Sequence, residues 1–65
     1  MEGATLAKNA FTFEEAAEFC EAEAAILRTA VQGAKANGAD TQSITMLMAQ
    51  LAEAEVLALK FRALL

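Results

Sequence analysis

The chain has 65 residues, so it forms one small domain, whose core is not expected to provide more than about 3 to 5 kcal/mol of stability without cross-links or oligomerisation. Its net charge of −4 disfavours a nucleic-acid partner and an anionic membrane surface, and one cysteine with no histidine excludes an intrachain disulfide and an ordinary structural zinc site. Hydrophobic residues make up 57% of the chain, above the usual share of about 45 to 50%, which indicates that the protein associates. The sequence is rich in alanine, the strongest helix former, and has no proline, so we expect an all-α fold.

Residues 1–11 show no sustained hydrophobic period and include Gly3 and Asn9. We expect a short N-terminal arm that orders on contact with a partner, with Leu6 and Phe11 as its anchors. A frayed terminus is the alternative interpretation.

The first helix is predicted over residues 12–36. Thr12 and Glu15 have the spacing of a capping box, in which each residue satisfies a backbone group of the other. An apolar stripe with a seven-residue repeat follows, made of Phe13, Ala17, Cys20, Ala24, Leu27, Val31 and Ala34. Phe19 and Ile26 widen this apolar arc, so we expect both in an interface.

A turn is predicted over residues 37–40 and a second helix over 41–65. Gly38 suits the left-handed position just past a helix end, and Asp40 or Thr41 suits the N-cap of the next helix. So short a connection makes two helices of about 24 residues lie side by side and antiparallel. The expected fold is therefore an antiparallel helical hairpin.

The second helix carries two apolar stripes. The first consists of Ile44, Leu47, Leu51, Ala54, Ala58, Phe61 and Leu65. The second lies about 150° around the helix and consists of Ala49, Ala52, Val56, Leu59 and Ala63. Because the first helix can cover only one stripe, we expect another chain to cover the other, giving a four-helix or larger bundle.

Charges give a predicted register for the hairpin. If the helices pair symmetrically about the turn, Arg62 lies beside Glu14 and Glu15. The same register makes Glu21 face Glu55, an unfavourable pair that Arg28 or a second chain would have to relieve.

Glu23 is the polar residue that we single out, because it lies inside the apolar arc of the first helix. The predicted register brings it near Gln50. A buried carboxylate must be hydrogen-bonded or neutralised, so we predict a buried contact between these two residues that fixes the register. A catalytic or ligand-binding carboxylate is the alternative, but no basic or nucleophilic residue lies within a turn of Glu23.

No residue pattern indicates a catalytic, cofactor or metal site. Di-metal sites in helical bundles use a Glu-x-x-His motif, and this chain has no histidine. Cys20 lies on the apolar stripe without a neighbouring base, which favours a buried thiol over a nucleophile. Glu14, Glu18 and Glu21 are typical of a solvated face, and an acidic face that imitates nucleic acid is the alternative.

Together these features predict a non-enzymatic structural or interaction protein that forms homo-oligomers. The alternative function is an acidic adaptor or inhibitor, of the kind that viruses and mobile elements encode, which docks its apolar face and its arm onto another protein. Charges interrupt the apolar run over residues 46–65, and residues 1–11 do not resemble a signal peptide. The expected location is the cytoplasm.

Overall fold

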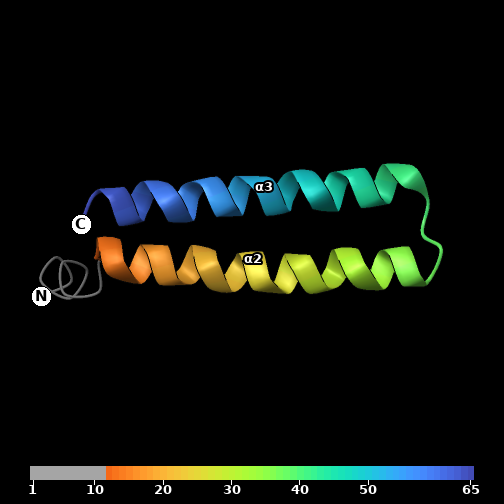
Figure 1. Cartoon of the computed structure of the whole chain (residues 1–65), viewed down its shortest axis with the longest axis horizontal. Coiled ribbons are helices and arrows are strands. Elements are labelled where there is room, and N and C mark those ends of the chain that lie inside the picture. The colour runs from red at the N-terminus through yellow and green to blue at the C-terminus, as the bar shows by residue number, and fades with distance from the viewer. Residues whose placement is uncertain (1–11) are drawn as a thin grey trace, which may run out of the picture.

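The computed structural model describes residues 12–65, which form two helices, α2 (Phe13–Ala36) and α3 (Thr41–Ala63). The helices lie side by side and antiparallel, with their connection at one end and the C-terminus beside the start of α2 at the other (Figure 1). The predicted all-α hairpin is confirmed, and its second helix ends two residues earlier than expected. The arm expected over residues 1–11 lies outside the described residues.

The predicted capping box starts α2. The Thr12 hydroxyl oxygen accepts a hydrogen bond from the Glu15 backbone N–H at 3.1 Å, and the Thr12 N–H donates to Glu15 Oε1 at 3.0 Å. The backbone N–H groups of Thr12 and Glu15, which a helix start would leave unpaired, are thereby satisfied.

Gly38 ends α2 and makes the tight connection possible. Its φ of 74° lies in the left-handed region, and its N–H donates to the Lys35 carbonyl at 3.2 Å while the Ala39 N–H donates to the Ala34 carbonyl at 2.9 Å. These two bonds define a Schellman motif. Asp40 then occupies the N-cap of α3, without a capping hydrogen bond from its side chain.

The core between the helices is thin. The buried hydrophobic residues within 12–65 are Ala17, Ala24, Val31, Ala54 and Ala58. Larger apolar residues such as Leu27, Leu51 and Phe61 are only half-buried at the edges of this contact, and no large side chain in this part of the chain is fully buried. Alanine lets the helix backbones approach closely but removes little apolar surface from water.

Two arginine–glutamate pairs join the helices, and the predicted partner of Arg62 is wrong. Arg62 forms two hydrogen bonds with Glu21, at 2.9 and 3.0 Å, seven residues beyond the predicted Glu14. Arg28 pairs with Glu55 at 2.9 Å, so each acid in the expected repulsive pair has its own arginine. Counting from the turn ignores which side of each helix a residue occupies, and residues seven apart share a side.

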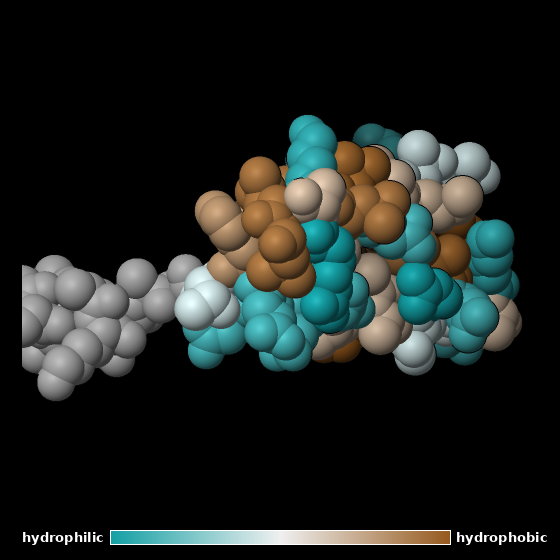
Figure 2. Space-filling view, turned by 60° about the vertical axis from the view of Figure 1, so that its left-hand side comes forward, coloured by the Kyte–Doolittle hydropathy of each residue, from teal (hydrophilic) through white to brown (hydrophobic). Residues whose placement is uncertain are grey.

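The open end of the hairpin is apolar. Phe13 stacks on Phe61 with ring centroids 6.3 Å apart, and Leu64 and Leu65 beside them are 58% and 67% exposed. Figure 2, which brings this end forward, shows hydrophobic side chains gathered over it. Within residues 12–65, neither helix contains a stretch long and apolar enough to cross a bilayer.

Candidate interaction surfaces

Exposed apolar side chains are the dominant surface feature of the described hairpin. Ten large hydrophobic residues within 12–65 are at least 40% exposed: Phe13, Phe19, Ile26, Met46, Met48, Val56, Leu57, Leu59, Leu64 and Leu65. Contiguous exposed apolar surface on a small protein marks an interaction site more often than single exposed residues do.

The second apolar stripe of α3 is not covered by α2. All of its residues are exposed, as the sequence pattern requires for a stripe that the other helix does not cover: Ala49, Ala52, Val56, Leu59 and Ala63. Val56 and Leu59 are 48% and 71% exposed. We call this stripe the outer face of α3.

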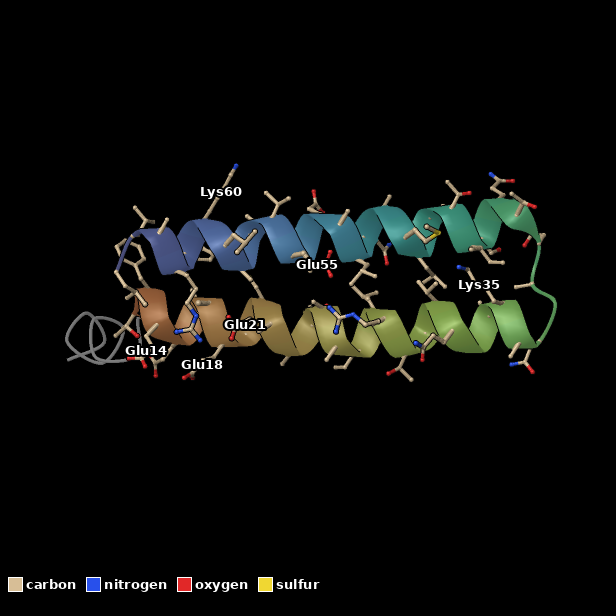
Figure 3. All side chains as sticks on the ribbon, in the orientation of Figure 1. Glu14, Glu18, Glu21, Lys35, Glu55 and Lys60 are labelled. Carbon is tan, nitrogen blue, oxygen red and sulfur yellow. The ribbon has the colours of Figure 1, made fainter. Side chains whose placement is uncertain are left out.

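The outer face borders the side of the hairpin that carries both ion pairs. Leu59 lines a shallow hollow together with Glu21, Arg28 and Glu55. In Figure 3, Glu21 and Glu55 lie toward the contact between the helices, whereas Lys60 points away from α2. We call this the ion-pair side.

Arg62 favours the ionised form of Glu21. The hydrogen bond from Arg62 lowers the pKa of the Glu21 carboxyl below its usual value, and the positive charge of the guanidinium acts in the same direction. The same contact raises the pKa of Arg62. Both side chains are about half exposed, so this pair orients the helices more than it stabilises them.

A shallow apolar groove runs along the other side of the hairpin. Cys20 and Arg28 lie one turn before and one turn after the buried Ala24, and each is displaced by about 40° in opposite directions around α2. The hollow on the Cys20 side has a volume of about 210 Å³ and is lined by Phe19, Cys20, Glu23, Leu27, Gln50, Glu53, Ala54 and Leu57. It continues into an apolar hollow of about 220 Å³ lined by Ala16, Phe19, Cys20 and Phe61. We call the two hollows together the groove.

Glu23 and Gln50 both line the groove, but the buried contact predicted between them is absent. Both side chains are exposed, and no hydrogen bond joins them. The prediction took the whole apolar arc of α2 as covered. The helix contact covers only the narrow strip around Ala17 and Ala24, and Glu23 lies about 100° from its centre.

The predicted interface residues do not form one continuous surface. Phe19 and Ile26 are 61% and 64% exposed, on α2. Phe19 borders the groove, Ile26 lines none of the hollows described above, and neither lies with the outer face of α3. Sequence reasoning missed Leu57, which completes the groove. Its spacing of seven residues from Gln50 and from Leu64 is the signal that could have found it.

The chemistry available in the groove is that of apolar contact and negative charge. Cys20 is a half-buried free thiol, and no basic residue lines the groove beside it. Among residues 12–65, no group of three or more His, Cys, Asp or Glu residues could hold a metal ion. The groove therefore offers apolar contact beside the carboxylates of Glu23 and Glu53.

No protein-family model matches the chain, and comparisons with curated proteins and with solved structures return no significant match.

Proposed function

We propose that this chain is a non-enzymatic helical hairpin that self-assembles and serves as a structural or interaction module. One observation carries the proposal. The described hairpin buries four alanines and one valine, while large apolar side chains remain exposed along both of its helices. Such a distribution is typical of a protomer whose main core forms between chains.

Magnitudes favour assembly as the main source of stability. Fully burying a valine or leucine side chain contributes about 1.5 to 3 kcal/mol, and alanine contributes much less. Covering Val56 and Leu59, which are 48% and 71% exposed, would therefore contribute more than the buried alanines do. A hairpin of this size gains little from its own core, so oligomerisation is a common solution.

Native mass measurement tests the proposal. We expect the wild-type chain to exceed the mass of one chain at micromolar concentration, and the variant V56E/L59E to be monomeric while remaining helical by circular dichroism. T29E/Q42E is the matched control, because it adds the same two charges at exposed polar positions. We expect this control to assemble like the wild type.

A folded wild-type monomer at micromolar concentration, with V56E/L59E equally stable, would refute self-assembly. A wild-type chain that is monomeric alone but purifies with one stoichiometric foreign protein would refute it in favour of an adaptor.

A further inference from the structure

We propose that the side chain of Phe11 fills the apolar hollow at the open end of its own hairpin. This hollow has a volume of about 220 Å³ and is lined by Ala16, Phe19, Cys20 and Phe61. Phe11 directly precedes Thr12, the first residue that the structure describes. The inference does not depend on self-assembly, because the occupant and the hollow belong to the same chain.

The start of α2 indicates which residue meets the hollow. Thr12 is the N-cap in an extended conformation, and its capping box with Glu15 is complete. At helix starts of this kind, the residue before the N-cap often packs against the fourth residue of the helix. This contact, the hydrophobic staple, fixes the direction from which the chain enters the helix. In this chain the two residues of the staple are Phe11 and Ala16.

The walls of the hollow surround this staple position. Ala16 is half-buried, and Phe19 and Cys20 follow it by three and four residues, so the three side chains share one face of α2. Phe61 is the wall that α3 contributes, and it also stacks on Phe13 with ring centroids 6.3 Å apart. Alanine is too small to fill the space between these walls, which leaves room for a larger side chain.

The chemistry of the walls suits an aromatic ring. Among residues 12–65, no charged or amide side chain lines this hollow, and a free cysteine packs as a small hydrophobe. Two of the walls are phenylalanines, and aromatic rings pack favourably on one another in offset-stacked or edge-to-face arrangements. Phe11 would thus join the three other phenylalanines of the chain at the open end.

Chain connectivity favours Phe11 over a side chain of another molecule. A group on a short tether has an effective concentration of about millimolar at its site, so a second copy or a foreign protein at micromolar concentration competes at a disadvantage. Leu6, the other predicted anchor of the arm, lies five residues farther from the N-cap and has a longer tether.

Tryptophan fluorescence tests the contact, because the chain has no tryptophan or tyrosine. The variant F11W carries a single emitter, and Cys20 in the hollow is the only thiol that can quench it on contact. We expect F11W to emit at a shorter wavelength than L6W, and its intensity to rise several-fold in F11W/C20A. L6W is the matched control, and C20A should leave its emission unchanged.

Reaction of Cys20 with a maleimide gives a second measurement on variants that add no ring. F11A should react several-fold faster than the wild type, because the thiol loses the side chain that covers it, and L6A should react like the wild type. G38A, which changes the far end of the hairpin, shows how much global unfolding alone accelerates the reaction. We expect F11A to react faster than G38A.

Equal emission wavelengths for F11W and L6W, no gain of intensity in F11W/C20A, or an F11A variant that reacts no faster than G38A would each overturn the proposal. Quenching of F11W/C20A by an excess of the wild-type chain would also overturn it, because Phe11 would then fill the hollow of another copy. None of these readouts depends on the mass of the wild type, so self-assembly is tested separately.

Discussion

Glu21 and Arg62 form the ion pair with the most hydrogen bonds in the described hairpin, and they make its stability depend on pH. Two hydrogen bonds join them across α2 and α3, and the folded protein holds the pKa of Glu21 below its usual value of about 4.5. In the unfolded chain this hydrogen bond is absent. The stabilisation from the carboxylate is therefore fully present above the usual pKa, and it is lost as the pH falls through the lowered value.

We predict that E21Q flattens the acid side of the stability profile. The variant should be slightly less stable than the wild type near neutral pH, and the difference should shrink as the pH falls through the lowered pKa of Glu21, because the wild-type carboxyl then becomes protonated as well. Thermal unfolding midpoints between pH 2.5 and 7 measure this effect. E18Q is the control, since Glu18 forms no ion pair within residues 12–65. A wild-type profile parallel to that of E21Q would contradict the assigned pairing.

Gly33 and Gly38, near the C-terminal end of α2, test the backbone conformation with which this helix ends. Gly33 lies inside α2, and a Cβ added there would meet nothing within 4 Å. We predict that G33A raises the free energy of unfolding by about 0.5 to 1 kcal/mol, because alanine loses less backbone entropy in a helix. Gly38 has open space too, but its φ is 74°. We predict that G38A lowers the free energy of unfolding by about 1 to 2 kcal/mol, because L-residues are strained there.

Urea midpoints at one fixed protein concentration compare these two variants with the wild type. Both substitutions add the same methyl group, so opposite signs isolate the backbone conformation as the cause. A G38A variant as stable as the wild type would show that α2 does not end in the Schellman motif, and a destabilised G33A variant would contradict the open helical position of Gly33.

Local features of the elements could be predicted from the sequence, and their relative rotation could not. The capping box at Thr12 and the left-handed Gly38 each depend on a few neighbouring residues, so short spacings were enough to find them. The pairing of Arg62 with Glu21 depends on which sides of two helices meet. The exposed position of Glu23 depends on how narrow that contact is, and the apolar pattern alone does not give its width.

At the scale of the whole molecule, the candidate surfaces divide in the same way. The outer face of α3 could be predicted, because a helix that is apolar on two sides exposes one of them when it meets a single neighbour. The groove could not, because its walls come from both helices and its location depends on their register. Leu57 therefore acquires its role only when α2 places Phe19 and Cys20 beside it.

The last prediction concerns how stability depends on the amount of protein. If the exposed apolar surface is covered by other copies, association stabilises the folded state by mass action. A tenfold rise in concentration then adds up to about 1.4 kcal/mol per chain, which corresponds to an increase of up to roughly 6 to 11 °C in the unfolding midpoint of a domain of this size. T29E/Q42E should show the same dependence, and V56E/L59E should show none. Midpoints of the wild type that stay constant over a hundredfold range would mean that the thin alanine core is sufficient by itself, and that Val56 and Leu59 face water in the native protein.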